Sequence, residues 1–474
     1  MEQKHLNILL KVDASFEQKA KYVFRTFGKI LGLKINFFTA STLEPIHLYY
    51  GSYIEDSFPI HIYHDLSAPD FFSSNQPSPS YKFHLLKYKD EYIPMLFSRP
   101  GKLFRYTSNS IRLRKDIISS AFFFLTCWQE YASGKESSPS APYNYQDSLQ
   151  HKYGFAEIAP VDRYCEILKN MLKQTFPEIV IMNVWPEGKK FALSVSHNVE
   201  FWDFWSKEYI DEILQQKKTL QNKEQRNIYW NARFHKLIRP YSTSADHGFA
   251  KLIRKEKIYK FKASFFLITK TDFPDRRRNY FAQEKCLPKL EKLLKNGNVN
   301  LLGSEEAGSD PDILKQEWEK LTEFPAKGFR VRNLNAPYQK LFAILEEAKI
   351  NFDSSLGFDV KTGFRAGISY PFQPYNLPED RPFDILEIPL ILDNSALQAE
   401  AGRNSTKTKK ILKRMFKQTL EHHAHLSISW QSHKLYSSSF LSHRNLFWQF
   451  IGYAKLHNAW ICSLEKLYNY WQNR

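Results

Sequence analysis

The stretch that decides the fold lies near the middle of the chain and reads Phe191-Ala192-Leu193-Ser194-Val195-Ser196-His197-Asn198-Val199-Glu200. Its first half is apolar enough to predict a short buried strand. Three polar side chains that can bind a metal or act in catalysis, His197, Asn198 and Glu200, follow where such a strand meets solvent. Because α/β folds build their ligand sites at strand ends, we predict the functional site here.

Strand-like and helical patterns alternate from about residue 185 onward. The predicted strands cover residues 191–196, 263–269, 298–302, 328–331, 385–389 and 426–430, and the predicted helices cover residues 288–296, 311–322, 337–348 and 408–424. This alternation predicts a parallel sheet or barrel with helices outside. Residues 202–260 interrupt the alternation, and their basic, Trp-containing sequence predicts a helical insertion over one end of the barrel.

Residues 1–178 have a different pattern and predict a smaller α+β domain in front of a barrel domain at 185–474. Short strand-like runs at 46–50 and 59–63 alternate with polar turns. A helix is predicted over 116–131, with Asp116 at its start, and another over 161–176, with Pro177 after its end. The Ser- and Pro-rich residues 133–145 predict a surface loop.

Composition narrows the classes of function. The chain has 474 residues and a formal net charge of +17, with 43% hydrophobic and 16% aromatic residues. These values predict two domains with large aromatic cores. Lys and Arg are spread along amphipathic segments and no nucleic-acid-binding signature accompanies them, so we expect a solvated basic surface and no nucleic acid partner.

The N-terminal residues, the apolar stretches and the cysteines bear on where the protein is located. The first ten residues lack a basic region followed by a long apolar run, and no apolar stretch reaches membrane-spanning length, so neither a signal peptide nor a membrane span is expected. The cysteines are far apart and show no CxxC spacing, which predicts reduced thiols in a cytoplasmic protein. They are Cys127, Cys165, Cys286 and Cys462.

Several motifs follow one another in the barrel region. They read Ser196-His197-Asn198-Val199-Glu200, Ala263-Ser264-Phe265-Phe266-Leu267, Phe352-Asp353-Ser354-Ser355-Leu356-Gly357-Phe358 and Gly363-Phe364-Arg365-Ala366-Gly367-Ile368-Ser369-Tyr370-Pro371-Phe372. In these motifs residues 185 to about 435 resemble the polysaccharide deacetylase family (NodB homology, carbohydrate esterase family 4), especially a two-domain Bacteroidetes-type subgroup. The N-terminal unit resembles the partner domain of that subgroup through Ala121-Phe122-Phe123-Phe124-Leu125-Thr126, Glu130-Tyr131 and Asp147-Ser148-Leu149.

The resemblance implies a distorted (β/α) barrel and a divalent, zinc-like ion held by one Asp and two His. Carried over by position, the general base falls on Asn198, which cannot accept a proton at neutral pH, and the metal carboxylate falls on Glu200. The first metal His falls on Leu302, which has no ligand atom, and the second falls on Glu306. The resemblance therefore implies an impaired hydrolytic site, and no cofactor is expected.

Two further motifs of the family are also changed. The Arg-containing strand keeps Arg330 but has Arg332 where the subgroup usually has His. The motif that supplies the general acid has Gln431 in place of His, with His433 two residues further on. Loss of several groups that act as one set is expected to cost orders of magnitude in rate.

Other candidates have two interpretations each. Arg365, between Gly363 and Gly367, can approach a carboxylate or phosphate, or it can be a buried Arg paired with Asp353 or Glu387. Asp353 itself can orient a catalytic group or cap the turn that follows it.

The aromatic and His candidates are equally open. His197 can be a cleft ligand or a structural group, and Trp202 and Tyr370 can stack on sugar rings, whereas core packing is favoured for Trp430. The run His422-His423-Ala424-His425 predicts a solvated cluster at a helix end. The candidate catalytic residues are therefore Asn198, Arg330, Asp353, Arg365 and His433, the candidate substrate-binding residues are His197, Glu200, Trp202, Glu306, Tyr370 and Trp430, and no metal ligand is assigned.

Three functions follow from these patterns. The leading hypothesis is a catalytically impaired deacetylase homologue that binds a carbohydrate or a glycan-synthesis protein. The first alternative is an active metal-dependent hydrolase of N-acetylated sugars that uses Glu200, Glu306 and His433 as replacement ligands or acid. The second is a non-catalytic scaffold or adaptor with a basic surface, which would be favoured if Leu302 and Trp202 filled the cleft. The sequence leaves the oligomeric state open.

Overall fold

The chain is described from a computed structural model. It covers residues 5–40, 43–54, 57–73, 83–98, 101–135, 143–202, 204–215, 223–238, 245–283, 286, 288, 298–321, 324–332, 336–402, 404–436 and 440–474. The predicted helix at 288–296 and most of the predicted loop at 133–145 lie outside these residues.

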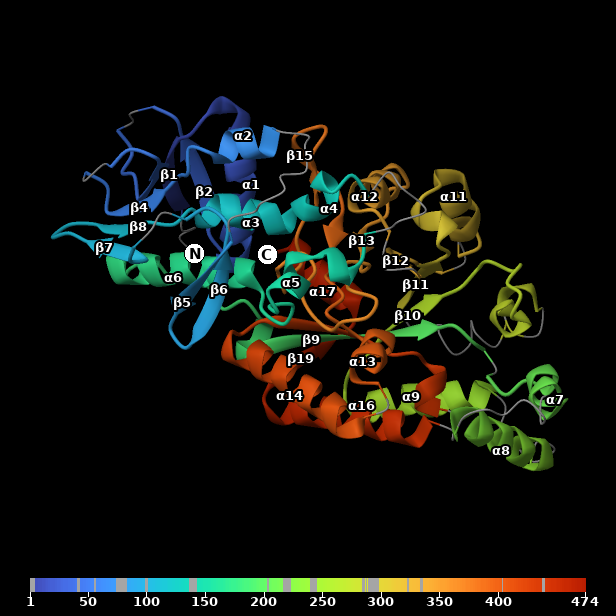
Figure 1. The fold of residues 1–474 in the computed structure, drawn as a ribbon. Coiled ribbons are helices and arrows are strands. Elements are labelled where there is room, and N and C mark those ends of the chain that lie inside the picture. Colours follow the sequence, from blue (N-terminus) through green and yellow to red (C-terminus); the bar gives the residue numbers. More distant parts are fainter. Residues whose placement is uncertain are drawn as a thin grey trace.

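The N-terminal sheet has six strands in the order β2-β1-β3-β4-β8-β7 (Figure 1). They are β1 (His5–Lys11), β2 (Lys34–Phe38), β3 (Leu48–Gly51), β4 (Ile60–Tyr63), β7 (Phe104–Tyr106) and β8 (Ile111–Leu113). All neighbours are parallel except β7 and β8. The arrangement is thus a mostly parallel α/β sheet, and the predicted α+β class is wrong in this respect, because β1, β3 and β4 pair through crossovers and not through hairpins.

Helices α1 (Ala14–Leu31), α3 (Ile117–Leu125) and α6 (Pro160–Thr175) pack on this sheet, with the short α2 (Ala68–Ser73) and α5 (Leu149–Lys152) beside them. Strands β5 (His84–Tyr88) and β6 (Glu91–Met95) form a separate hairpin. The predicted helix 116–131 is broken: Cys127 has φ +47°, which ends α3 and starts α4 (Trp128–Ala132). Asp116 caps α3, as the sequence predicts.

The second sheet has the order β16-β13-β12-β11-β10-β9-β18-β17, and β19 also pairs with β9. All its pairs are parallel. Its strands are β9 (Phe191–Val199), β10 (Ser264–Leu267), β11 (Asn298–Gly303), β12 (Gly328–Val331), β13 (Phe352–Asp353), β16 (Leu386–Glu387), β17 (Leu392–Asp393), β18 (His425–Ser429) and β19 (Ala459–Cys462).

The two edges of this sheet are joined by residues 388–391. A chain of this length spans roughly 17 Å at most, so edge strands β16 and β17 can only be connected if the sheet curls on itself. The fold is therefore a barrel-like, parallel α/β sheet, which confirms the coarser part of the fold prediction.

Helices surround the curled sheet. They are α11 (Pro311–Glu319), α12 (Tyr338–Glu347), α13 (Asn394–Ala401), α14 (Ser405–Glu421), α15 (His433–Tyr436), α16 (Leu441–Leu456) and α17 (Leu464–Gln472). The predicted insertion is helical as expected, with α7 (Lys207–Gln215), α8 (Lys223–Ile238) and α9 (Ala245–Ile258). In Figure 1, α7 and α8 project from the body, whereas Phe249 and Leu252 of α9 are buried in the main core.

One hydrophobic core runs through both halves of the chain. Backbone hydrogen bonds also join the halves: Val161 N donates to Gly367 O (2.9 Å), and Phe364 N donates to Ala156 O (2.8 Å). Strands β14 (Tyr375–Asn376) and β15 (Arg381–Pro382) form a small hairpin at this junction, where Tyr22 of α1 packs against Tyr375. The segment 352–390, which carries the most specific resemblance, therefore faces the N-terminal unit along part of its length.

The four cysteines are buried and none forms a disulfide. Within the part of the chain that the structure describes, none of the helices combines the length and the apolar character needed to cross a bilayer.

Candidate functional site

Strand β9 sends alternate side chains to opposite faces. Ser194, Ser196 and Asn198 point into the barrel, whereas His197 points outward between the sheet and helix α9. His197 is fully buried, its Nδ1 lies 3.0 Å from Trp430 O, and its Nε2 lies 3.2 Å from Glu256 Oε1. The substrate-binding role predicted for His197 is wrong, because the two-residue period of a strand separates it from Asn198 and Glu200.

Asn198 and Arg330 meet inside the barrel, as the predicted site requires. Arg330 Nη1 donates to Asn198 Oδ1 (2.9 Å) and to Ser196 Oγ (3.1 Å), and its Nε donates to Ser354 O (2.8 Å). The guanidinium also lies 4.1 Å from the centre of the Phe266 ring. Burial lowers the pKa of Arg330 to about 10, so the group stays charged at neutral pH. Every face of this cation is occupied by protein.

Two buried carboxyl groups lie near Arg330. Asp353 accepts from Ser355 N (2.9 Å) and Ser355 Oγ (2.7 Å), and Glu387 Oε1 accepts from Leu356 N (3.0 Å). Burial raises the pKa of Asp353 and raises that of Glu387 well above its ordinary value. We infer that the pair holds a proton at neutral pH and that Arg330 balances the remaining charge. Asp353 thus caps its own turn, which was one of its two predicted roles.

An ion pair closes the mouth of the barrel. Glu200 Oε1 accepts from Gln431 Nε2 (2.7 Å), and Glu200 Oε2 lies 3.2 Å from Arg278 Nη2. Gln431 Nε2 also lies 3.2 Å from Ser395 Oγ. Both oxygens of Glu200 are therefore engaged by the protein's own donors.

The residues at the implied metal positions do not fit a divalent ion. Leu302 is buried and has no donor atom, and Glu306 is 53% exposed and pairs with Lys270 (3.1 Å). His433 is buried with its ring stacked on Phe204 at 4.9 Å. A cation at Arg278 would also repel a metal beside Glu200. Among the described residues, no group of three His, Cys, Asp or Glu side chains is placed to hold a metal ion, so the proposed replacement set of Glu200, Glu306 and His433 does not assemble.

Arg365 lies at the junction of the two halves and not in the barrel mouth. Its Nε donates to Glu130 Oε1 (2.8 Å) and its Nη2 donates to Glu130 Oε2 (2.6 Å), and both side chains are buried. The prediction that Arg365 binds a ligand is wrong, and so is its predicted pairing with Asp353 or Glu387. Its partner comes from α4 of the N-terminal unit.

Two of the predicted sugar-stacking aromatics are core residues. Trp202 is 5% exposed and stacks on Phe249 at 4.9 Å. Tyr370 is also 5% exposed and stacks on Trp185 at 5.7 Å. Neither ring has a free face for a sugar.

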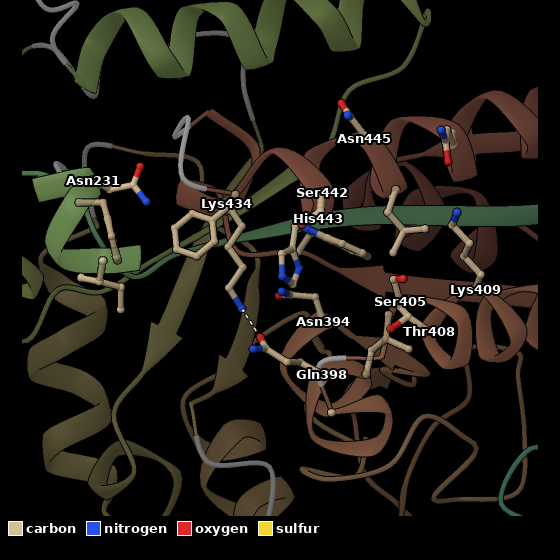
Figure 2. Close-up of a pocket in the computed structure, with 18 of the residues that line it drawn as sticks. Asn231, Asn394, Gln398, Ser405, Thr408, Lys409, Lys434, Ser442, His443 and Asn445 are labelled. Carbon is tan, nitrogen blue, oxygen red and sulfur yellow. Dashed lines mark hydrogen bonds between the residues drawn. The ribbon is translucent and has the colours of Figure 1, made fainter. Parts of the chain in front are cut away.

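A pocket of about 950 Å³ opens beside the closed mouth (Figure 2). It lies between α13, α14, α15, α16 and the helical insertion. Its polar lining residues are Asn231, Asn394, Gln398, Ser405, Thr408, Lys409, Lys434, Ser442, His443, Asn445 and Gln449, and its aromatic ones are Phe204, Trp205, Trp430 and Phe440. This size is typical of small-molecule sites.

Two buried N–H donors at this pocket lack a protein acceptor among the described residues. They are Trp430 Nε1 and Asn394 Nδ2, and each residue is 2% exposed. The orientation of the Asn394 amide is fixed because its Oδ1 accepts from Gln431 N (3.1 Å). Buried donors are normally paired, so these two are available to an acceptor that a ligand supplies.

The electrostatic character of the pocket is positive. Lys409 and Lys434 line it, and no carboxylate is among the lining residues that the structure describes. Lys434 Nζ donates to Gln398 Oε1 (3.2 Å), and Figure 2 shows Lys434, His443 and Asn394 gathered near the middle of the pocket. Burial and the nearby Lys434 lower the pKa of His443, so its imidazole is neutral at pH 7.

The sequence singled out Trp430, although core packing was the favoured interpretation for it, and it did not single out Asn394, Lys409, Lys434 or His443. A signal for Asn394 was present, because Asp393-Asn394-Ser395 follows the apolar run 388–392 just as the polar cluster follows β9. Lys409 and His443 lie on surface helices, where no sequence pattern separates a pocket residue from a solvated one.

Comparisons with known proteins add the following. A family of unknown function, DUF7033, matches residues 8–177, which is less than half of the chain. A search of curated proteins finds no match. Among solved structures, a protein assigned as a polysaccharide deacetylase from Mycobacterium smegmatis is 13% identical with a TM-score of 0.39, covering 61% of this chain and 92% of that one. The Puue allantoinase is 14% identical with a TM-score of 0.41, covering 63% and 95%. At these scores the barrel assignment rests on the strand order of the chain itself.

Proposed function

We propose that this protein binds an anionic carbohydrate, such as a uronate-bearing oligosaccharide, in the 950 Å³ pocket beside the barrel mouth, and does not hydrolyse it. The observation that carries the proposal is a pair of buried donors, Trp430 Nε1 and Asn394 Nδ2, in a pocket with two lysines. Among the residues that the structure describes, these donors have no acceptor and the pocket lining has no carboxylate. Hydroxyl and carboxylate oxygens are the acceptors that such donors select. The deacetylase resemblance supports a sugar ligand.

The non-hydrolytic part of the proposal is supported by the closed mouth. A general base is missing because Asn198 is an amide that accepts from Arg330, and Glu200 is held by Arg278 and Gln431. A neutral amide cannot take a proton from water, and both oxygens of Glu200 already accept from the protein's own donors. The polar residues at the end of β9 are therefore paired with other residues of the protein.

Calorimetric titration of oligogalacturonate, with a neutral malto-oligosaccharide of equal length as comparator, tests binding. We expect the anionic sugar to bind and Trp430→Phe to weaken binding about tenfold, because the substitution keeps an aromatic side chain, though a smaller one, and removes one N–H donor. Lys409→Ala should also weaken binding, whereas Lys410→Ala, the next residue of the same helix, should not. Equal affinity for both sugars, or binding that these substitutions leave unchanged, would overturn the proposal.

The same samples test hydrolysis. Acetate release from N,N′-diacetylchitobiose, measured with and without added zinc, should stay at the level of the buffer blank. Release that Glu200→Gln abolishes would show that the mouth is catalytic and would restore the active-hydrolase alternative.

An adaptor role is the second candidate, and one surface favours it. Trp230, Phe234 and Leu237 of α8 are 60%, 51% and 77% exposed, and they recur at helical spacing. An exposed apolar stripe of this kind is typical of docking surfaces. This candidate predicts partner binding that Trp230→Ala abolishes and that Trp430→Phe leaves unchanged.

A further inference from the structure

The N-terminal sheet carries a second pocket, of about 640 Å³, at the carboxyl ends of parallel strands β1, β3 and β4. Strand β2 pairs with one side of β1, and β3 pairs with the other. Open α/β sheets place their ligand crevices at this kind of switch point, because the chain leaves adjacent strands in opposite directions. The location alone therefore suggests a site that is separate from the barrel.

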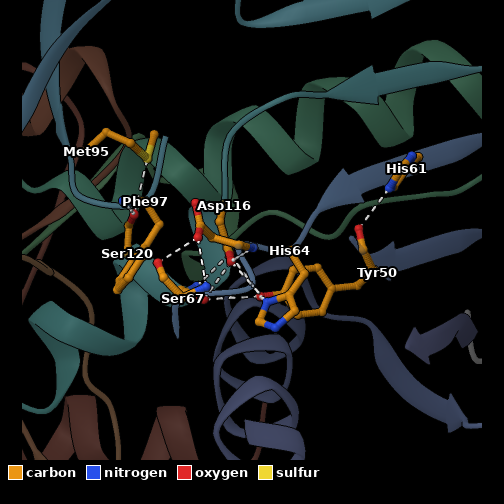
Figure 3. A network of polar contacts seen from close by, with 11 residues as sticks. Tyr50, His61, His64, Ser67, Met95, Phe97, Asp116 and Ser120 are labelled. Atoms are coloured by element: carbon orange, nitrogen blue, oxygen red, sulfur yellow. Dashed lines mark hydrogen bonds and ion pairs between the residues drawn. The ribbon is translucent and has the colours of Figure 1, made fainter. Parts of the chain in front are cut away.

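His64, the first residue after β4, forms part of the pocket wall. Its ring is 1% exposed and is held by stacking on Phe16 at 5.2 Å. Nδ1 lies 2.9 Å from Tyr50 Oη and 3.2 Å from Asp116 Oδ2. In Figure 3 the dashed lines reach this nitrogen of His64 only, and Nε2 has no hydrogen-bond partner among the described residues. A buried ring nitrogen without a protein partner is uncommon, so Nε2 can pair with a water or with a ligand.

Asp116 orients this ring through its contact with Nδ1. Its carboxylate is fully buried and accepts from Ser119 N (2.8 Å), Ser119 Oγ (2.7 Å), Asp65 N (2.8 Å) and Tyr50 Oη (2.9 Å). A carboxylate oxygen accepts hydrogen bonds, so the contact of His64 Nδ1 with Asp116 Oδ2 places a hydrogen on Nδ1. In the tautomer that carries its hydrogen on Nδ1, the lone pair lies on Nε2.

The rest of the pocket supplies mainly acceptors. Asp13 caps α1 by accepting from Ser15 N (2.9 Å), and the hydrogen bonds from Ser15 lower the pKa of Asp13, which is therefore anionic at neutral pH. Asp70 adds a second carboxylate. Among the lining residues that the structure describes, Lys11 is the single Lys or Arg, and its Nζ donates to Thr39 O (2.8 Å). Acceptors and negative charge outnumber cations at this pocket.

We propose that this pocket binds a small polyhydroxylated amine, of the size of an amino sugar, with His64 Nε2 accepting a hydrogen bond from a ligand hydroxyl and the carboxylates of Asp13 and Asp70 facing the ammonium group. The pocket volume fits one or two sugar rings. This site is separate from the proposed barrel pocket, and its expected ligand is cationic where that of the barrel pocket is anionic.

Long-range ¹H–¹⁵N spectra of the full chain labelled at His test the proposal, with His64→Gln to assign the signals. We expect the Nδ1–H tautomer at His64 and a shift of its Nε2 resonance when glucosamine is titrated. Glucose should bind more weakly, and glucuronate should not bind. The Nε2–H tautomer, or no shift of His64 with glucosamine, would overturn the proposal.

Variants that keep the fold make the test specific. Asp13→Asn preserves the helix cap, since Asn caps as well as Asp, and Asp70→Asn preserves side-chain volume. Each should weaken glucosamine binding about tenfold through the lost charge. Glu17→Gln is the matched control, because Glu17 lies in the first turn of α1 but does not line the pocket. Equal weakening in all three variants would show a long-range charge effect and contradict a built site.

Discussion

The two strand-end regions of this molecule differ in whether their polar side chains are fully paired with other protein groups. At the barrel mouth, the polar groups that β9 delivers are paired with protein groups: Asn198 with Arg330, and Glu200 with Arg278. At the N-terminal sheet, β4 delivers His64, whose Nδ1 is held by Asp116 while its Nε2 has no partner among the described residues. Strand ends place polar side chains reliably, but the partners of those side chains decide whether a ligand is needed.

The two pockets also differ in charge. The barrel pocket has Lys409 and Lys434 and, among its described lining residues, no carboxylate, whereas the N-terminal pocket has Asp13 and Asp70 against Lys11. A protein with a net charge of +17 would attract anions over much of its surface, so the acidic pocket is a local exception. Binding experiments with an anionic and a cationic ligand should therefore distinguish the two sites.

The largest expected effect comes from removing the cation inside the barrel. Arg330→Met keeps most of the volume but leaves the Asp353–Glu387 pair without its neighbouring charge, so the free energy of unfolding should fall by about 3–5 kcal/mol. Urea denaturation at pH 7 measures it. Arg332→Met is the matched control, because Arg332 is only half-buried over the Phe273 ring. Equal losses in both variants would show that Arg330 does not balance the buried carboxyls.

Acid should destabilise the barrel through His425, which lies 2.8 Å from Ser194 Oγ and 2.9 Å from Ser369 O. Burial lowers its pKa from 6.5 to about 4. Because the unfolded chain binds the proton more tightly, this stability is complete above pH 6.5 and is lost as the pH falls to 4, by up to about 3 kcal/mol.

Unfolding free energies at pH 7 and pH 4 should therefore differ less in His425→Gln than in the unmodified protein. His5→Gln, at an exposed position, serves as control. An unchanged difference in His425→Gln would assign the acid sensitivity to other groups.

The smallest effect is expected at the barrel mouth. Glu200 and Arg278 are 13% and 21% exposed, so Glu200→Gln or Arg278→Gln should cost about 1 kcal/mol or less. Thermal melting of both single variants and the double variant measures the coupling. A loss above about 3 kcal/mol in one single variant would mean that the ion pair at the mouth is structural and would sharpen the contrast with His64.

Much of the barrel could be predicted from local patterns. The strand predicted at 328–331 coincides with β12, and the others are displaced by a few residues. The strand-end rule placed Asn198 and Glu200 at the end of the strand that the structure shows as β9. It failed for His197 because the alternation of side chains along a strand was not taken into account. Ser194, Ser196 and Asn198 share one face of the strand, and Val195 and His197 share the other. His425, predicted to be solvated, lies inside the barrel because β18 begins at that residue.

The remaining misses involve contacts between distant parts of the chain. Arg365 and Glu130 are 235 positions apart, and His64 and Asp116 are 52 apart. No periodicity in one segment indicates its partner in another, so the sequence could not distinguish a ligand-binding Arg from a junction Arg. The strand at 59–63 was predicted, however, and applying the strand-end rule to it would have singled out His64.

The Arg365–Glu130 pair has a consequence for synthesis on the ribosome. At usual elongation rates, the 235 positions between them take roughly 10 to 50 s to make, and during that time Glu130 has no guanidinium to neutralise it. The N-terminal segment then exposes the apolar surface of α3 and α4 that residues 363–370 later cover. We expect nascent chains shorter than about 370 residues to depend on chaperones, and released full-length chains to complete both halves in one cooperative step.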